Sequence, residues 1–299
     1  MSHEIRPRRS ALYMPGSNAR ALEKARTLAA DALILDLEDA VAPAAKPDAR
    51  AEVAAAVAAA VAAGGYGPRE VVIRINALST EWGRDDLEAA LAAGPDAILV
   101  PKVSSAEELG RIRAAFAAAG AEGGVALWIM METPLAILNA GEIAAAARDR
   151  DAPLECLVMG TNDLAKETGA SLRQGRFAMV PWLATCLAAA RANGLSILDG
   201  VYNDFRDADG FAAECAQGAA LGMDGKTLIH PSQVAPANEI FAPAPAEVEW
   251  AKAVIAAFAR PENQGRGVIE LDGRMVELMH LETALRTAAI AAAIEARTG

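Results

Sequence analysis

Cysteine, histidine and aromatic residues are scarce in this chain. Its 299 residues include three cysteines, three histidines and 4% aromatic residues. The cysteines form no C-x-x-C pair and the histidines stand far apart, which argues against a disulfide framework or a zinc centre. These residues are Cys156, Cys186, Cys215, His3, His230 and His280. Because no secretory signal pattern is visible either, we expect a protein of the reducing cytoplasm.

Positive charge is also in short supply. With 28 Lys and Arg against 39 Asp and Glu, the formal net charge is −11 and the pI is near 4.9. Such a chain is a poor polyanion binder, so we expect no nucleic-acid partner, although a local cluster of Arg and Lys could bind a small anionic substrate. No apolar run reaches the roughly 18 residues that cross a bilayer, so we expect no membrane span.

Short apolar runs alternate with helical patterns along most of the chain. The runs are 11–14, 32–37, 71–75, 97–100, 125–131, 154–159, 196–198 and 227–229. The helical patterns are 19–29, 48–63, 85–92, 106–119, 135–147, 182–192 and 208–221. Continuous runs of Val, Ile and Leu are typical of strands buried on both faces.

This alternation amounts to roughly eight β/α units, the number that a closed parallel barrel requires. We therefore predict an α/β protein with a (β/α)₈ TIM barrel over residues 1–235. A doubly wound sheet is the alternative, but the first strand–helix turn lacks the G-x-G-x-x-G pattern.

The pattern changes after His230–Pro231, where prolines punctuate the chain. The elements expected beyond it are a helix over 247–259, a strand over 268–271, a hairpin-type Asp-Gly turn at 272–273 and a helix over 277–296. Residues 236–299 exceed what a barrel needs. We expect a C-terminal helical extension that seals the barrel, lies across it as a lid or packs on a neighbouring subunit.

Two apolar runs end in carboxylates. Glu132 follows the run at 125–131, and Asp163 follows the run at 154–159 after a Gly-Thr-Asn segment. Successive barrel strands are neighbours and barrel chemistry lies at their C-terminal ends, so both side chains are expected in one pocket. Two carboxylates with the remaining positions open are typical of Mg²⁺, with Mn²⁺ as the alternative ion.

An arginine interrupts another apolar run. Arg74 stands within the sequence Val-Val-Ile-Arg-Ile-Asn, where a buried guanidinium needs an anionic partner from the protein or the substrate. The acidic segment Asp36-Leu37-Glu38-Asp39 ends the neighbouring strand. One of its acids is expected to bind Arg74 or a metal-bound water, and we place Arg74, Glu38 and Asp39 among the catalytic candidates.

Other ionisable or polar residues also stand at predicted strand ends, where each could instead belong to a solvated rim. They are Asn76, Lys102, Asp199, Tyr202, Lys226 and His230. A Schiff base on Lys102 stays open, but there is no G-x-S-x-G motif and no cysteine beside a histidine. The carboxylate pair favours metal chemistry over a protein nucleophile.

The turn after the first strand could hold phosphate. Small polar residues at a helix start expose backbone N–H groups, although ordinary helix capping explains the same pattern. Basic residues at the start of this helix and the next strengthen the case for a nucleotide-tail site. The candidates are Ser17, Asn18, Arg20, Lys24, Lys46 and Arg50.

Taken in order, these motifs resemble the citrate lyase β-subunit-like family of the HpcH/HpaI aldolase superfamily. That family includes malyl-CoA, β-methylmalyl-CoA and citramalyl-CoA lyases and malyl-CoA thioesterases. The matching segments cover nearly the whole chain and are specific as an ordered set. They are 12–18 (LYMPGSN), 35–41 (LDLEDAV), 74–76 (RIN), 100–102 (VPK), 132–134 (ETP), 160–163 (GTND), 222–226 (GMDGK) and 229–231 (IHP).

The resemblance implies a barrel that assembles as a trimer or hexamer and binds Mg²⁺ through Glu132 and Asp163, with Arg74 contacting substrate. It also implies that the loop after the first strand receives coenzyme A. In the family a neighbour's C-terminal segment supplies an acid, commonly Asp in a Gly-x-Met-x-Asp context. Here Glu277 stands in its place, within Gly273-Arg274-Met275-Val276-Glu277. Glutamate reaches about 1 Å further, and errors of that size can cost about 100-fold in rate.

The function expected from the resemblance is a Mg²⁺-dependent carbon–carbon lyase. It would cleave or form a 3-hydroxyacyl-CoA such as malyl-CoA, citramalyl-CoA or citryl-CoA, with an acyl-CoA and a 2-oxo acid as its other partners. The alternative is a malyl-CoA thioesterase that uses the same metal site. A non-catalytic CoA-binding subunit is the third possibility. Glyoxylate and pyruvate differ by one methyl group, worth only about 1–3 kcal/mol, so the sequence does not select the oxo acid.

Overall fold

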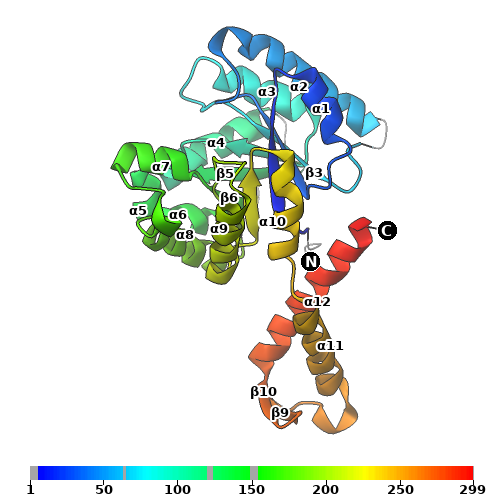
Figure 1. Ribbon diagram of the computed structural model, residues 1–299. Helices are drawn as coiled ribbons and strands as arrows, with labels where there is room; N and C mark the ends of the chain where they lie inside the picture. The colour runs from blue at the N-terminus through cyan, green and yellow to red at the C-terminus, as the bar shows by residue number, and fades with distance from the viewer. Residues whose placement is uncertain (1–5, 63–64, 120–123, 149–153, 299) are drawn as a thin grey trace. The chain divides into compact units, whose positions relative to one another are not determined.

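Eight parallel strands close into a barrel in the computed structural model (Figure 1). The structure describes residues 6–62, 65–119, 124–148 and 154–298, so His3, Ala63 and Gly299 lie outside it. The strands are β1 (Ser10–Pro15), β2 (Ala32–Asp36), β3 (Glu70–Arg74), β4 (Ala97–Val100), β5 (Ala126–Met131), β6 (Leu154–Met159), β7 (Ser196–Asp199) and β8 (Gly225–Leu228). Each pairs with the next and β8 pairs with β1, which confirms the predicted (β/α)₈ barrel.

The strands form where the apolar runs lie because both of their faces are buried. Every residue of β2, β3, β4, β5 and β8 is buried. One set of side chains fills the barrel interior around Trp128, which is 0% exposed. A filled interior leaves only the strand ends for chemistry.

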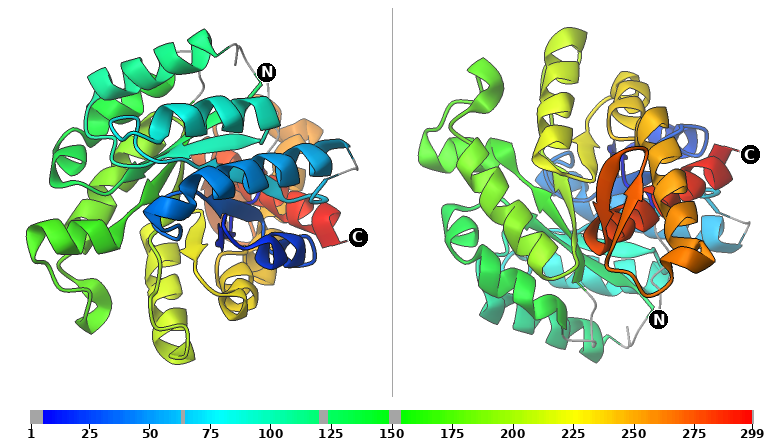
Figure 2. Two further views of the ribbon diagram at one scale, coloured as in Figure 1. Left: turned by 90° about the horizontal axis from the view of Figure 1, so that it is seen from above. Right: turned by 90° about the horizontal axis from the view of Figure 1, so that it is seen from below.

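Helices surround the strands, as Figure 2 shows. The α-helices of this unit are α1 (Ala19–Ala25), α2 (Lys46–Ala62), α3 (Gly83–Ala93), α4 (Ala106–Ala118), α5 (Pro134–Leu138), α6 (Ala140–Ala145), α7 (Thr161–Thr168), α8 (Val180–Ala192), α9 (Ala208–Leu221) and α10 (Val234–Ile240). The single helix expected over 135–147 is wrong, because the chain breaks at Asn139 between α5 and α6. Helix α7 was not predicted, and it begins directly after β6 at the expected metal site.

Strand register decides which residues meet at the C-terminal ends. Asp36 on β2 is the direct partner of Arg74 on β3. Met131 on β5 is the partner of Met159 on β6, so Glu132 and Gly160 are neighbours one residue further on. The ends of β2 and β3 therefore bring the acidic segment to Arg74, and the ends of β5 and β6 bring Glu132 next to Gly160.

The N-terminal ends of the strands carry different ion pairs. Arg8 donates to both carboxylate oxygens of Glu70, at 2.7 and 2.6 Å, and to Glu155 at 2.7 Å. Arg9 forms a two-pronged pair with Asp31, at 2.8 and 2.9 Å. These groups close the face of the barrel opposite to the strand ends that carry Glu132 and Arg74, where polar residues normally serve stability.

The residues from Ile240 onward form a second compact unit, separate from Arg8–Glu239. It contains α11 (Pro245–Ala259), a hairpin of β9 (Val268–Leu271) and β10 (Arg274–Glu277), and α12 (Leu278–Thr298). Asp272 and Gly273 turn the hairpin with φ of 52° and 72°, as the Asp-Gly signal predicts. Helix α11, the hairpin and α12 share one apolar cluster, made by Ala251, Val254, Ala257, Ile269, Val276 and Ala284. No helix in the described ranges is long and apolar enough to span a bilayer.

Candidate active site

Glu132 is buried at the C-terminal end of β5. Its side chain is 1% exposed, and its Oε1 accepts a hydrogen bond from the backbone N–H of Lys102 at 2.7 Å. Gly160 lies against it from β6: a Cβ atom at Gly160 would collide with the Cβ of Glu132 and lie 2.7 Å from its Oε2. The glycine in the Gly-Thr-Asn-Asp motif therefore makes room for this carboxylate.

Asp163 approaches the same point from the next β/α unit. It lies in the first turn of α7, where the positive end of the helix dipole favours a carboxylate. The ammonium of Lys102 is 2.9 Å from Asp163 Oδ1 and 3.9 Å from Glu132 Oε1. The two predicted metal ligands thus face one common cation position.

The electrostatics of this point favour a bound cation. Burial raises the pKa of Glu132 to about 7, an effect that the charge of Lys102 opposes and that of Asp163 reinforces. Burial alone would lower the pKa of Lys102, but Glu132 and Asp163 hold it above its usual value. A buried carboxylate of this kind is stabilised in its charged form by any cation placed beside it.

The donor set fits Mg²⁺ better than a softer metal. Within the described residues no group of three or more His, Cys, Asp or Glu side chains is gathered for a metal ion. Two carboxylates from adjacent strand ends are nonetheless what Mg²⁺ uses, because it keeps several waters or substrate oxygens. Glu132 and Asp163 would hold the ion and leave its other positions to the substrate.

Arg74 forms the centre of an acidic cluster beside this position. Its Nε and Nη2 donate to the two oxygens of Asp36 at 2.6 and 2.7 Å. Its Nη1 lies 2.8 Å from Glu38 Oε2 and donates to Asp39 at 3.2 Å. The expected pairing of Arg74 with the acidic segment is confirmed, and all three acids share one guanidinium.

Tyr13 is a site residue that the sequence reasoning did not single out. The Arg74 guanidinium lies 4.7 Å from the centre of its ring, a cation–π arrangement that keeps the guanidinium flat against β1. Its hydroxyl lies 3.5 Å from the sulfur of Met130, and burial raises its pKa, so it stays a neutral phenol. Its place in the Leu-Tyr-Met-Pro-Gly motif, two residues before the end of β1, was the signal in the sequence that could have identified it.

Glu38 has a buried oxygen without a hydrogen bond. Its Oε2 is close to Arg74 but outside hydrogen-bond geometry, and it finds no other partner among the residues that the structure describes. Burial raises the pKa of Glu38 to about 8, against the charge of Arg74 that acts to lower it. A weakly acidic carboxyl group with one oxygen that makes no hydrogen bond is suited to hold a water or a substrate hydroxyl.

Lys46 and Arg50, expected near coenzyme A, bond to the protein itself. The Lys46 ammonium is 5% exposed and donates to the carbonyls of Leu37 and Glu38 at 2.9 Å each and to Asn76 at 2.7 Å. Arg50 donates to the buried Asp86 at 2.7 Å. These contacts support the segment that carries Glu38, and a CoA role for either residue stays a prediction.

The other residues predicted at the nucleotide tail are exposed. Ser17, Asn18, Arg20 and Lys24 lie at the solvent surface around the start of α1. The Asn18 side chain accepts from the N–H of Ala21 at 3.1 Å, so the capping interpretation holds for this residue. Arg20 and Lys24 present their charges to solvent beside it, and their contact with phosphate stays a prediction.

Two other strand-end candidates pair with each other between strands β7 and β8 and helix α9. Asp199 is 0% exposed and forms a two-pronged pair with Arg176, at 2.6 and 2.8 Å. Lys226 donates to Asp199 at 3.0 Å and to Glu214 at 2.7 Å. Desolvation would raise the pKa of Asp199, but Lys226 and Arg176 hold it below its usual value. This network is internally satisfied and serves the packing of β7 and β8.

His230 and Tyr202 belong to the rim. The His230 ring stacks on Phe205 with centroids 4.5 Å apart, and its Nδ1 accepts from the N–H of Ser232. The Tyr202 hydroxyl donates to Asp207 at 2.6 Å. Neither contacts the acidic cluster, which fits the solvated-rim alternative for both.

Glu277 lies in the second unit, at the end of β10. Its side chain is half-buried, and its backbone N–H donates to His280 at 2.9 Å. The hairpin presents it next to exposed Met275, Leu278 and Met279. Its expected action at a neighbouring subunit's site stays a prediction.

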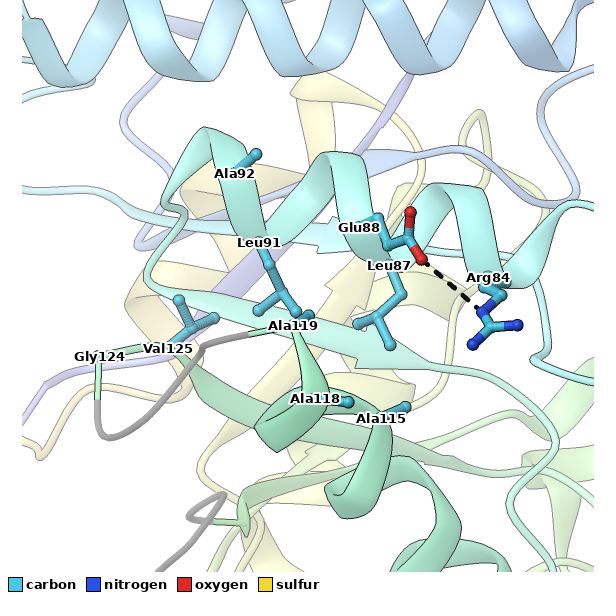
Figure 3. Close-up of a pocket in the computed structure, with 10 residues that line it drawn as sticks. All are labelled: Arg84, Leu87, Glu88, Leu91, Ala92, Ala115, Ala118, Ala119, Gly124 and Val125. Atoms are coloured by element: carbon cyan, nitrogen blue, oxygen red, sulfur yellow. Dashed lines mark ion pairs between the residues drawn. The ribbon is translucent and has the colours of Figure 1, made fainter.

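A separate groove runs along the outside of the barrel (Figure 3). Leu87 and Leu91 of α3 face Ala115 and Ala118 of α4 across it, and Val125 closes one end. Val125 precedes β5, whereas Glu132 follows it. The groove therefore lies outside the barrel between α3 and α4, and none of the candidate active-site residues lines it.

Comparisons with known proteins find relatives that match most or nearly all of the chain. Residues 9–231 match the family model described as HpcH/HpaI aldolase/citrate lyase. The chain is 52% identical to the (3S)-malyl-CoA thioesterase of Cereibacter sphaeroides (strain KD131 / KCTC 12085), over 99% of both chains. It is 30% identical to the mitochondrial citramalyl-CoA lyase of Homo sapiens, over 98% of this chain and 88% of that protein.

A solved structure gives the same fold. The chain resembles the crystal structure of CitE from Mycobacterium tuberculosis in complex with magnesium, acetoacetate and coenzyme A. The TM-score is 0.70 and the sequence identity 32%, with 94% of this chain and 97% of that chain covered.

Proposed function

Because the chain belongs to the HpcH/HpaI aldolase/citrate lyase family, we propose that it is a Mg²⁺-dependent thioesterase for a short 3-hydroxyacyl-CoA of the malyl-CoA type. The observation that carries the proposal is the convergence of Glu132 and Asp163 on one cation position at the C-terminal strand ends. The relative at 52% identity, named a (3S)-malyl-CoA thioesterase, favours hydrolysis over carbon–carbon cleavage.

The substrate class follows from the charges of the site. A malyl group carries a carboxylate and a hydroxyl on adjacent carbons, and such oxygens complete the coordination of a hard cation. When bound, Mg²⁺ supplies Lewis-acid stabilisation and a fixed orientation for these oxygens. The CitE structure with magnesium, acetoacetate and coenzyme A supports a site that holds an ion, a small oxo acid and coenzyme A together.

The chain's own residues would then carry the hydrolysis. Arg74, held against Tyr13, stabilises the negative charge that develops on the thioester oxygen. Glu38, whose Oε2 makes no hydrogen bond, orients a water and, in its ionised form above about pH 8, takes one of its protons as the water's oxygen bonds to the thioester carbon. The C–S bond breaks, coenzyme A leaves as the thiolate and is protonated, and the free acid remains. The net reaction consumes one water.

Carbon–carbon lyase activity is the second candidate. It is favoured by the citramalyl-CoA lyase relative and by a site that serves both reactions with the same ion and arginine. A lyase needs an acid that returns a proton to the acyl carbon, the role the resemblance assigns to the position of Glu277. The longer side chain there is a reason to place hydrolysis first.

Product analysis of the purified full chain tests the proposal. With Mg²⁺ and malyl-CoA, we expect free coenzyme A and malate in equal amounts, with no glyoxylate. Acetyl-CoA with glyoxylate as the main products would replace the thioesterase by the lyase. No turnover of malyl-CoA, citramalyl-CoA or citryl-CoA in either assay would exclude both.

A matched pair of variants shows where the reaction occurs. Glu132→Gln removes one predicted metal ligand, and Glu88→Gln removes an exposed carboxylate of α3 outside the barrel. We expect the first to lose at least ~100-fold in kcat/KM and the second to keep the wild-type value.

A further inference from the structure

Lys102 contacts both predicted metal ligands, Glu132 through its backbone N–H and Asp163 through its side-chain ammonium. Its backbone N–H donates to Glu132 Oε1 at 2.7 Å. Its side-chain ammonium lies 2.9 Å from Asp163 Oδ1 and 3.9 Å from Glu132 Oε1. The ammonium therefore occupies the position that the two carboxylates offer to a cation.

The backbone of Lys102 is in an unusual conformation. Its φ is 57°, one of three positive values among the non-glycine residues that the structure describes. A left-handed lysine costs on the order of 1 kcal/mol and persists only where the surroundings hold it. The residue in this conformation is the one whose N–H donates to Glu132.

The segment after Lys102 is anchored at several points. Ser104 Oγ lies 2.7 Å from Thr133 Oγ1, and Thr133 caps helix α5 directly after Glu132. The side chain of Asn139 donates to the Ser104 carbonyl at 2.9 Å. The loop after β4 is thereby tied to the loop after β5, so the approach of Lys102 to Glu132 is built into the backbone.

We infer that Lys102 is a positioning residue with two opposed effects: its N–H orients Glu132 for a divalent ion, and its ammonium competes with that ion for Glu132 and Asp163. The inference rests on the proposed metal site. Binding of the ion displaces the ammonium, because two cations cannot share the same carboxylate oxygens without strong repulsion. The affinity for the ion is then set below the value that the carboxylate pair alone would give.

The alternative is an ordinary surface ion pair. The Lys102 side chain is 42% exposed, and exposed pairs are often worth little. Under that alternative, removing the ammonium changes the affinity for a divalent ion no more than removing any other nearby positive charge. Lys166 supplies the matched control, because it is exposed on α7, the helix that carries Asp163.

Direct titration of the substrate-free full chain with Mn²⁺, followed by the EPR signal of the free ion, tests the inference. At low ionic strength we expect Lys102→Met and Lys102→Gln to bind Mn²⁺ about 5- to 10-fold more tightly than wild type. Both keep the backbone N–H. We expect Lys102→Arg not to bind more tightly and Lys166→Met to stay within about 2-fold of wild type. Equal or weaker binding by both neutral variants overturns the inference.

The same titration separates this inference from the proposed function. If wild type binds no Mn²⁺, or if Glu132→Gln binds it as well as wild type, the metal site itself is refuted. If Glu132→Gln abolishes binding while the neutral Lys102 variants leave it unchanged, only the role of Lys102 is refuted.

A measurement on the wild-type chain covers the case in which the variants do not fold. Acylation by an amine-reactive ester, read by peptide mass spectrometry, reports how accessible each lysine amine is. We expect Mg²⁺ to accelerate modification of Lys102 several-fold relative to Lys166 in wild type, and to leave the ratio unchanged in Glu132→Gln. If Mg²⁺ does not raise the ratio of Lys102 to Lys166 modification in wild type, the ion does not displace the Lys102 ammonium.

Discussion

Gly160 lies so close to Glu132 that no side chain fits between them: a Cβ atom there would lie 2.7 Å from Glu132 Oε2. The β5–β6 register places the two residues side by side at the mouth of the barrel. The position of the carboxylate is thus fixed from one side by a missing side chain and from the other by the N–H of Lys102.

Gly160→Ala should therefore displace Glu132. We expect weaker Mn²⁺ binding, by about 10-fold or more, together with a loss of stability of about 1–3 kcal/mol from overpacking. Gly110 in α4 is the control, since a Cβ atom there meets nothing within 4 Å. Gly110→Ala should keep metal binding and gain up to about 1 kcal/mol of helix stability. Titration with Mn²⁺ and urea unfolding measure both, and unchanged Mn²⁺ affinity in Gly160→Ala would count against the placement of Glu132.

Arg74 is tied to Asp36 by two parallel hydrogen bonds that lysine cannot reproduce. Arg74→Lys keeps the charge, but we expect kcat/KM to fall at least ~100-fold, because the guanidinium no longer spans Asp36 and the substrate. Arg74→Met removes the ion-pair partner of buried Asp36 and leaves it only the backbone N–H groups of Glu38 and Ala40, which should cost about 3–5 kcal/mol of stability. Steady-state kinetics and urea unfolding check the two effects. A fully active Arg74→Lys enzyme would rule out this part of the mechanism.

Two lysines separate structural support from coenzyme A binding. Lys46→Met removes the donor from the Glu38 carbonyl and from Asn76 Oδ1, while the Leu37 carbonyl keeps its bond from the Asn76 amide, and should cost about 2–4 kcal/mol of stability. Lys24→Met removes an exposed charge, so its stability should stay within about 0.5 kcal/mol of wild type. If Lys24 contacts a CoA phosphate, Lys24→Met should raise the KM for malyl-CoA several-fold. Urea unfolding and kinetics with malyl-CoA distinguish the two, and a CoA role for Lys46 would show as raised KM without lost stability.

Glu38 is expected to make the free energy of unfolding fall as the pH rises. Burial raises the pKa of its carboxyl group to about 8 in the folded chain, so the folded state holds its proton where the unfolded state has lost it. The stability that this group contributes is present below its ordinary pKa, near 4.5, and is lost as the pH rises through about 8.

Glu38→Gln removes this titration. With a chelator present, its free energy of unfolding should fall less between about pH 5 and about pH 8 than that of wild type. Glu107→Gln, on the exposed face of α4, should follow the wild-type curve. Parallel curves for Glu38→Gln and wild type would show that Glu38 is ionised in the folded chain throughout this range.

The side chain at position 277 is expected to influence the choice between reactions. Glu277→Asp shortens the acid by one methylene and restores the residue common in lyases of the resembling family. We expect the ratio of glyoxylate to free malate formed from malyl-CoA to rise in this variant. Glu277→Gln should not raise it, because an amide cannot return a proton. A ratio that is the same in all three proteins would leave position 277 without a part in selecting the reaction.

The barrel and its carboxylate pair could be predicted from the sequence because parallel strands that are buried on both faces appear in it as continuous apolar runs. A motif with a carboxylate follows each of β5 and β6, and closure of the barrel brings neighbouring strand ends together. The pairing of Arg74 with an acid could also be predicted, because a charged residue inside an apolar run needs an anion nearby.

Other parts of the site were not readable from the sequence, for physical reasons. Helix α7 is only eight residues long and buries only Thr161 and Leu164, so it offers too few apolar residues to be recognised as a helix. The burial of Lys46 depends on acceptors from two separate segments, which only the folded backbone assembles. The bridge made by Lys102 depends on a left-handed backbone conformation that lysine rarely adopts.

The metal site can be located directly by an anomalous difference map from crystals of the protein soaked in Mn²⁺. The expected result is a single strong peak within about 2.0–2.3 Å of one oxygen each of Glu132 and Asp163, with the Lys102 ammonium moved away from both. A strong peak elsewhere, or an undisturbed Lys102 ammonium between empty carboxylates at saturating Mn²⁺, would contradict the account.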